Sequence, residues 1–212
     1  MSESRKAGSV ILANLAMFNE SAILFESEIE PAFMEALDKT IEEWASQQEW
    51  IGLFEAYADK DTWIYPSEWR TSLAEEENDT VVAGFHFGFA HGEGDAYDLA
   101  DLCGVGQDEK GFIFRVKHEE FGGKSKWNKF YKQLPTSISS RLQALGFNDY
   151  GLSVFFIPIK LDPNLLANAW ENEDYVEIMQ PVITVLENIK QSVPIFDELF
   201  SLAKASGLAR VE

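Results

Sequence analysis

The sequence predicts an α+β fold, with a small central antiparallel β-sheet between an N-terminal helix and a C-terminal helical segment. Three observations predict it. Apolar residues recur at helical spacing near both ends of the chain, and β-forming stretches lie in its middle. Hydrophobic residues make up 46% of the 212 residues, which is enough for a core. Because helices and strands are segregated, we expect one domain, helical over 1–60, β-rich over 61–160 and helical over 161–212.

A helix is predicted from Pro31 to about Ser46, where the apolar residues share one helical face. They follow one another at spacings of four, four and three residues: Phe33, Leu37, Ile41 and Trp44. Pro31 suits the first turn because an N–H there has no partner within the helix. Glu28 and Glu30 lie at the helix start, where the helix dipole favours negative charge.

Strands are predicted for residues 80–90, 111–117 and 150–159, because these segments are rich in β-branched and aromatic residues. The second of them alternates along its length, as a strand with one buried face does. Further extended structure is expected around residues 62–65. Pro158 cannot donate a ladder hydrogen bond, so it predicts an edge or a strand end.

Helices are predicted again for the rest of the chain, first a short one at 137–145 and then a series from residue 162 onward. The clearest apolar stripe of this series has spacings of four, four and three residues: Ile178, Val182, Leu186 and Ile189. Pro181 and Pro194 are expected to divide the series into shorter helices. Ser192 is then a candidate cap for the last of them.

The single cysteine, Cys103, excludes an internal disulfide. No His or Lys flanks it closely, so we expect a buried and unreactive thiol. Asn14 interrupts the apolar residues 10–18 and no small-residue cleavage site follows them, so no signal peptide is expected. No apolar run approaches the roughly 20 residues that a membrane span needs. We therefore expect a cytoplasmic protein that does not contact a membrane.

Charge is the most unusual feature of the composition, since the formal net charge is −19. Residues 1–112 hold 24 acids against 6 bases, a net −18, and residues 161–212 hold 9 against 3, a net −6. Residues 113–160 reverse the sign, with 3 acids against 8 bases, a net +5. Because such a balance repels nucleic acid and anionic membranes, we expect no direct nucleic-acid partner.

The acidic residues have two interpretations, and the sequence leaves both open. One is a solvated surface that favours solubility. The other is a display of charge that imitates phosphate spacing and docks on a basic, nucleic-acid-handling protein. The residues assigned to this docking precede the second predicted strand: Glu75, Glu76, Glu77, Asp79, Glu93, Asp95, Asp98 and Asp101.

No motif for covalent or cofactor chemistry is present. The Gly-Val-Gly run at 104–106 lacks the third glycine of a dinucleotide-binding loop and the helix that follows one. No serine has the context of a nucleophile elbow, and no pair of cysteines exists. We therefore expect a non-enzymatic protein that uses no cofactor and acts by binding a basic protein partner.

The alternative is a metal-dependent enzyme or metal-binding protein centred on the region His86–Asp101. Its loop His91–Asp95 offers clustered oxygen ligands for a hard cation, but it matches no calcium-loop spacing, and a polar hairpin loop is the competing interpretation. The Asp-Glu-Lys run at 108–110 has the acid-x-Lys form of metal-dependent nucleases. We place it in the turn before the strand, where it would not serve that chemistry.

Residues 124–132 interleave four lysines with three aromatic residues. This composition suits nucleic acid, because lysines neutralise phosphates and aromatic rings stack on bases. It equally suits a helix that buries Trp127, Phe130 and Tyr131 on one face. We expect the second arrangement, with the lysines exposed: Lys124, Lys126, Lys129 and Lys132.

The order of several segments carries a resemblance that covers residues 60–205. These segments are Tyr65–Trp69, Phe85–Phe89, Trp127–Leu134 and the helical close from 174 to 197. In this order they resemble the region that follows the catalytic domain in prokaryotic and phage proteins of the PD-(D/E)XK nuclease superfamily. The chain lacks the upstream catalytic acids of that superfamily, so the resemblance implies no nuclease activity. It implies a stand-alone accessory or inhibitor module related to phage or defence functions.

Overall fold

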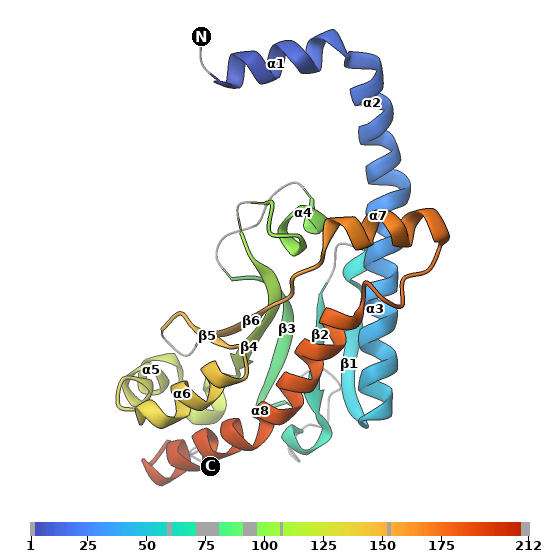
Figure 1. Ribbon diagram of the computed structural model, residues 1–212. Helices are drawn as coiled ribbons and strands as arrows, with labels where there is room; N and C mark the ends of the chain where they lie inside the picture. Colours follow the sequence, from blue (N-terminus) through green and yellow to red (C-terminus); the bar gives the residue numbers. More distant parts are fainter. Residues whose placement is uncertain are drawn as a thin grey trace.

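The computed structural model describes residues 3–58, 61–70, 81–90, 97–106, 108–151 and 154–208. Within them, one sheet runs through the molecule in the order β1-β2-β3-β4-β6-β5, and all neighbouring strands are antiparallel (Figure 1). The strands are β1 (Trp50–Phe54), β2 (Thr62–Pro66), β3 (Ala83–Phe89), β4 (Lys110–Val116), β5 (Asn148–Asp149) and β6 (Phe155–Pro158). Helices precede and follow this sheet, which confirms the predicted α+β class.

Helices of the described residues lie at both ends of the chain and between the later strands. The α-helices are α1 (Glu3–Ala13), α2 (Leu15–Leu24), α3 (Glu30–Gln47), α4 (Asp98–Leu102), α5 (Lys124–Tyr131), α6 (Thr136–Ala144), α7 (Pro163–Asn172) and α8 (Gln180–Ala205). A π-helical turn, η1 (Phe25–Ile29), joins α2 to α3. Three 3-10 turns complete the list: η2 (Ala56–Ala58), η3 (Ser67–Trp69) and η4 (His118–Phe121).

Helix α3 confirms the prediction for the N-terminal half, since all four residues of the predicted apolar face are buried. The indole N–H of Trp44 donates a hydrogen bond to Glu187 of α8 at 2.7 Å, which ties the two helices together. Asp38 is also buried on α3 and accepts a hydrogen bond from the hydroxyl of Thr62 at 2.8 Å. This polar contact connects α3 to the start of β2.

The core between the sheet and α8 consists mainly of aromatic rings. Phe85 of β3 and Phe114 of β4 are cross-strand partners whose side chains face this core. Phe196 of α8 stacks on Phe114, with 3.8 Å between the ring centroids and 17° between the planes. Further rings contact Phe196 from other elements: Phe85, Phe147, Phe155 and Trp69. This cluster joins η3, three strands of the sheet and the segment before β5 to the C-terminal helix.

The predicted break of the C-terminal helix at Pro194 is wrong, because α8 continues through this residue. Pro181 does occupy the first turn of α8, where a proline costs nothing. Ser192 is not a cap either: it is buried, and its hydroxyl donates to the carbonyl of Ile189 at 2.6 Å. Burial of one apolar face of the helix outweighs the roughly 3 kcal/mol that an interior proline costs.

The predicted strands are confirmed as β3, β4 and β6, each close to its expected place. Pro158 is the last residue of β6, as predicted, and lies beyond the part of that strand that pairs with β5. The predicted all-helical character of 1–60 is wrong at its end, because β1 lies there and pairs along its whole length with β2. The predicted β-rich middle also holds three α-helices: α6 confirms the short helix predicted at 137–145, and α4 and α5 precede it.

The first two helices extend away from the rest of the molecule (Figure 1). Residues 3–24, which form α1 and α2, are called the N-terminal arm below. The arm bends at Asn14, whose side-chain amide donates to the carbonyl of Val10 at 2.9 Å. Among the described residues no single helix is long and apolar enough to cross a membrane, and only Ser4–Ala13 with Leu15–Gln47, a pair bent by 90°, passes that test by length and composition.

Candidate docking groove

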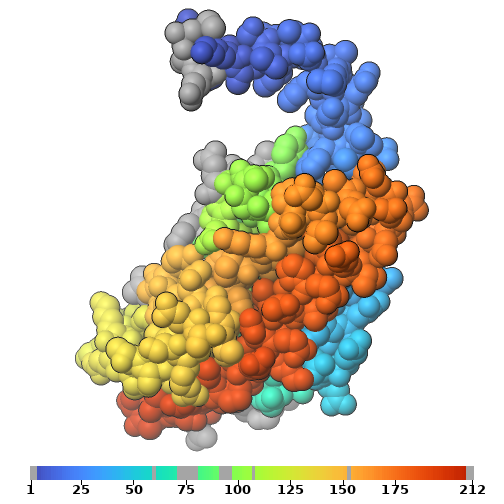
Figure 2. All heavy atoms as spheres, viewed as in Figure 1, coloured from blue at the N-terminus to red at the C-terminus, as the bar shows by residue number. Residues whose placement is uncertain are grey.

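An apolar groove of about 580 Å³ lies where η1 and the start of α3 meet α4 and α7. Figure 2 shows the η1–α3 segment in blue, α4 in green and α7 in orange, side by side. The η1–α3 segment, the α4 region and α7 each contribute two of the large side chains that line the groove: Phe25, Phe33, Tyr97, Leu99, Leu166 and Trp170. Glu171 is the one charged residue among the described lining residues. A groove of this size and composition suits an apolar side-chain face.

Helix α7 forms one wall of the groove, and local sequence signals explain its position. The carboxylate of Asp162 caps the helix by accepting a hydrogen bond from the backbone N–H of Asn164 at 2.8 Å. Pro163 follows in the first turn, where it is well tolerated. Leu166 and Trp170 are four residues apart, so they share one face of α7 and point together into the groove.

The short helix α4 forms another wall, and it is held in place by hydrogen bonds that acidic residues of η1 and α3 accept. Glu30 accepts from the backbone N–H of Leu99 at 3.0 Å. Glu26 accepts from the hydroxyl of Tyr97 at 2.8 Å. This hydrogen bond raises the pKa of Tyr97, with smaller contributions from desolvation and from the charges of both glutamates. The two contacts bring α4 against the base of the N-terminal arm.

A buried ion pair anchors the same helix to the sheet. Lys110, the first residue of β4, is only 6% exposed. Its ammonium group contacts the carboxylate of Asp98 on α4. The ammonium also lies 5.0 Å from the ring centroid of Phe87 and 4.5 Å from that of Phe89, so both rings offer it cation–π contacts. The position of α4, and with it one wall of the groove, depends on this pair.

The charged residues of η1, α4 and α7, which form much of the groove wall, are acidic. Neither η1, α4 nor α7 contains a lysine or an arginine. Exposed carboxylates lie on η1, on α7 and at both ends of α7, next to residues that line the groove, and we call them the acidic rim: Glu26, Glu28, Asp162, Glu171 and Glu173. The thiol of Cys103 lines the groove, and partial burial followed by the nearby charge of Asp162 raises its pKa. This thiol therefore stays protonated at neutral pH.

The structure bears on two of the eight acidic residues predicted to dock on a partner. Asp98 is engaged with Lys110, as described above. Asp101 is 2% exposed, and its carboxylate accepts a hydrogen bond from the backbone N–H of Asp108 at 3.3 Å. The prediction of an exposed docking role is therefore wrong for Asp101, because this carboxylate turns inward. The other six lie outside the described residues: Glu75, Glu76, Glu77, Asp79, Glu93 and Asp95.

The groove itself was not predicted, although its sequence signals are visible in hindsight. Phe25, Ile29 and Phe33 recur every four residues and all line the groove. Leu166 and Trp170 have the same spacing on α7. Such repeats are ordinarily the buried face of a core helix. Nothing in the sequence indicates that the two faces would leave a space between them.

The alternative metal site has no support among the described residues, where no group of three or more His, Cys, Asp or Glu could hold a metal ion. The loop His91–Asp95 lies outside them. Lys110 is not in a turn, as the sequence suggested, but begins β4. Its ammonium contacts Asp98, while the carboxylate of Asp108 accepts the N–H of Glu109 at 2.8 Å. The acid-x-Lys residues therefore stabilise the fold.

His86 is expected to make the stability of the protein depend on pH, because its pKa is lowered in the folded state. Burial on β3, and secondarily the charge of Arg115, lowers its pKa from 6.5 to about 4, although Asp61 opposes the shift. Between pH 7 and pH 5 the unfolded chain therefore takes up a proton at His86 and the folded chain does not. We expect this group to cost up to about 2 kcal/mol of stability at pH 5. Urea unfolding at both pH values, compared with His86→Gln, measures it; an equal loss in the variant contradicts it.

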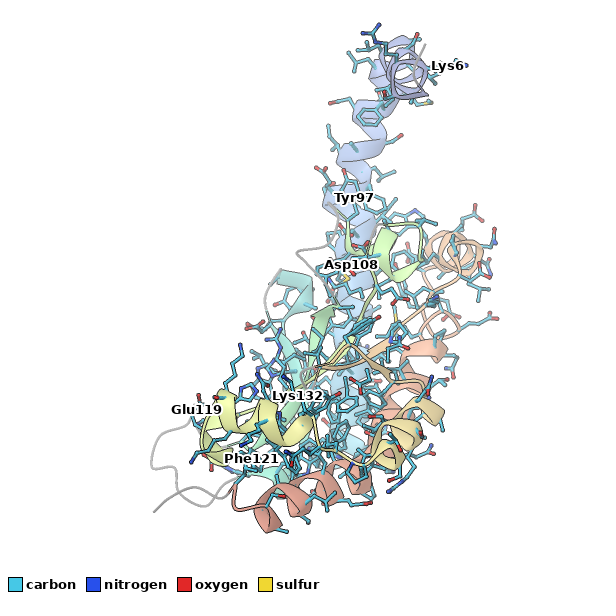
Figure 3. The ribbon with its side chains drawn as sticks, turned by 90° about the vertical axis from the view of Figure 1, so that its left-hand side faces the viewer. Lys6, Tyr97, Asp108, Glu119, Phe121 and Lys132 are labelled. Atoms are coloured by element: carbon cyan, nitrogen blue, oxygen red, sulfur yellow. The ribbon has the colours of Figure 1, made fainter. Side chains whose placement is uncertain are left out.

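The basic segment lies away from the groove (Figure 3), where Lys132 and Tyr97 mark the two regions. Residues 124–131 form α5, and the predicted orientation is confirmed. Trp127 and Phe130 are buried and Tyr131 is half-buried. The lysines are exposed: Lys124, Lys126, Lys129 and Lys132. The aromatic rings thus belong to the core, where they cannot stack on bases.

No protein-family model, curated protein or solved structure matches this chain. The resemblance to the PD-(D/E)XK nuclease superfamily therefore stays a prediction, and the function has to be inferred from the groove and its charge.

Proposed function

We propose that this protein is a non-catalytic binding protein whose groove docks on an apolar helix with basic flanks in a nucleic-acid-handling protein. The observation that carries this proposal is the combination of an apolar groove with the carboxylates of the acidic rim, one of which, Glu171, lines the groove itself. An apolar lining alone would accept many apolar faces. The rim restricts the partner to one that carries positive charge beside its apolar face.

The lining and the rim have separate roles in this proposal. Large side chains of the partner helix, at positions i, i+3, i+4 and i+7, would fill the groove and supply most of the binding energy. Rim carboxylates such as Glu171 and Glu173 remain in water, where each ion pair adds little affinity. Their effect is to accelerate association with a basic partner and to disfavour acidic ones.

Docking of this kind would make the protein an inhibitor. Nucleic-acid-handling proteins bind phosphates through basic surfaces, and a bound protein with a net charge of −19 would repel nucleic acid from such a surface. This is the role that the resemblance to accessory modules of phage and defence proteins implies. The partner's basic residues, rather than its nucleic acid, would be the target.

The proposal is tested with a fluorescein-labelled helical peptide of about 18 residues that carries leucines at i, i+3, i+4 and i+7 and lysines elsewhere. We expect fluorescence anisotropy to show binding that weakens at least about tenfold in Leu166→Asp, which places a charge in the groove. Asn168→Asp adds the same charge to an exposed position of α7 outside the groove, so it should bind normally.

Two further measurements separate the groove from non-specific attraction. Raising the salt from about 50 to about 300 mM should slow association more than it speeds dissociation, because the rim acts at long range. The same peptide with glutamates in place of lysines should bind much more weakly. Equal binding of the lysine peptide to wild type and Leu166→Asp would show that attraction to the acidic surface explains the result, and it would refute the proposal.

A further inference from the structure

The N-terminal arm exposes an apolar surface that no other part of the described chain covers. Neither α1 nor α2 contributes a residue to the buried core. Eight large hydrophobic side chains of the arm are 40% to 70% exposed. Six of them illustrate its composition: Val10, Leu12, Leu15, Met17, Phe18 and Ile23. Apolar patches beyond a few hundred Å² on a protein surface mark interaction sites, so we expect the arm to have a binding partner.

The arm and the groove are next to each other in one chain, but the arm does not lie in its own groove. Phe25 and Ile29 of η1 line the groove, and α2 leaves directly from η1. Helix α2, η1 and α3 follow one another without a loop, so the arm extends away from the groove. Figure 3 shows the result: Lys6 lies at the far end of the arm, well separated from Tyr97 in the groove wall.

We infer that α1 from one copy of this chain lies in the groove of a second copy, and that the exchange is reciprocal. The inference rests on the proposed function, since it names an occupant of the same groove. Helix α1 has the chemistry that the groove requires: apolar side chains such as Leu12, with Arg5 and Lys6 on the turn before them. These two bases face an acidic rim in the partner copy.

Charge favours contact through the arm over contact through any other part of the surface. Each copy has a net charge of −19, so two copies of the protein repel each other at long range. Residues 3–24 contain two acids and two bases, which makes the arm neutral. Reciprocal exchange also covers two arms and two grooves in a single closed dimer, as expected for a twofold assembly. The groove of the dimer is then occupied until an external helix displaces the arm.

A membrane is the other apolar environment that an exposed helix can enter. The structure favours protein contact, because the arm is bent by 90° at Asn14 and Glu20 lies in its second leg. A straight crossing needs roughly 20 apolar residues. The acidic residues Glu26 and Glu28 follow the arm closely, and they would repel an anionic lipid surface.

Cys103 makes the exchange directly testable, because it lines the groove and is the one cysteine of the chain. A second cysteine is placed on the exposed side chains of α1, as Ser9→Cys or Ala13→Cys. Oxidation of the full-length protein at about pH 9, where more of the Cys103 thiol is ionised, should then give a disulfide-linked dimer on a non-reducing gel for at least one of the two variants. The dimer should disappear when Cys103→Ser is added. A dimer that survives this change refutes the inference, since it would join two arms.

Sedimentation analysis with two charge variants gives an independent test. Leu12→Asp disables the arm and Leu166→Asp disables the groove, so each alone should be monomeric at concentrations where the wild type is dimeric. Their mixture should form dimers, because an intact arm of one then meets an intact groove of the other. Leu12 is 70% exposed, so its variant should keep the wild-type melting temperature. Dimers of Leu166→Asp alone would indicate pairing between arms and overturn the inference.

The remaining outcomes separate this inference from the proposed function. A wild type that is monomeric, or that floats with phosphatidylcholine vesicles as a monomer, overturns the exchange. If the lysine-rich peptide still binds such a monomer, the proposed function stands by itself. If the exchange is correct, Leu12→Asp should bind that peptide at least about fivefold more tightly than the dimeric wild type, because no arm competes for its groove.

Discussion

We expect Phe196→Ala to lower the free energy of unfolding by about 3–5 kcal/mol, the range for removing a large buried aromatic side chain. Phe196 is fully buried. Its ring stacks on Phe114 and contacts rings from the strands and from η3. The cavity left by this ring would lie between the sheet and α8, where backbones on both sides are held by their own hydrogen bonds. The site can therefore not collapse to fill it.

Urea unfolding followed by circular dichroism measures this effect, and Phe18→Ala is the matched control. Phe18 lies on the N-terminal arm and is 50% exposed, so the same substitution should change stability by less than about 0.5 kcal/mol. The comparison is made at a concentration where the protein is monomeric. Similar losses for the two variants would contradict a core centred on Phe196, and so would a loss below about 1 kcal/mol for Phe196→Ala.

The second large effect is expected for Asp98→Ala, which should lower the free energy of unfolding by about 3 kcal/mol. Removing one partner of a buried ion pair leaves the other charge without compensation. The side chain of Lys110 is only 7% exposed, whereas that of Asp98 is 22% exposed. The unpaired charge that remains buried in the variant is therefore the ammonium group of Lys110. Since α4 forms a wall of the groove, the variant should also bind the lysine-rich peptide more weakly.

A double-mutant cycle tests the cause of this effect. Lys110→Met keeps most of the side-chain volume and its contacts with Phe87 and Phe89, while Asp98 can become hydrated. The double variant Asp98→Ala with Lys110→Met should therefore recover at least about half of the stability that Asp98→Ala loses. If the two losses simply add, the ion pair does not couple α4 to β4, and another cause of the destabilisation is required.

Local patterns in the sequence were sufficient to predict the elements that bury one face and expose the other. The spacing in α3 predicted its buried face because a long helix on a sheet hides a single stripe. The aromatic residues of α5 were likewise assigned to the core, and Trp127 is fully buried. The α+β class followed from where these periodicities lie along the chain. None of these conclusions requires knowledge of which segments meet.

Contacts between distant segments decided the remainder. Helix α8 continues through Pro194 because its packing on the sheet outweighs the free-energy cost of a proline inside a helix. The residues that α8 packs against are far from Pro194 in the sequence. The local sequence predicts Lys110 to lie in a turn. In the structure it begins β4, and Asp98 and two aromatic rings surround its ammonium group. The groove combines residues from 25–33, 97–105 and 163–171. The sequence by itself determined which faces are apolar; only the tertiary structure decided which of them are covered, since burial depends on partners that are far apart along the chain.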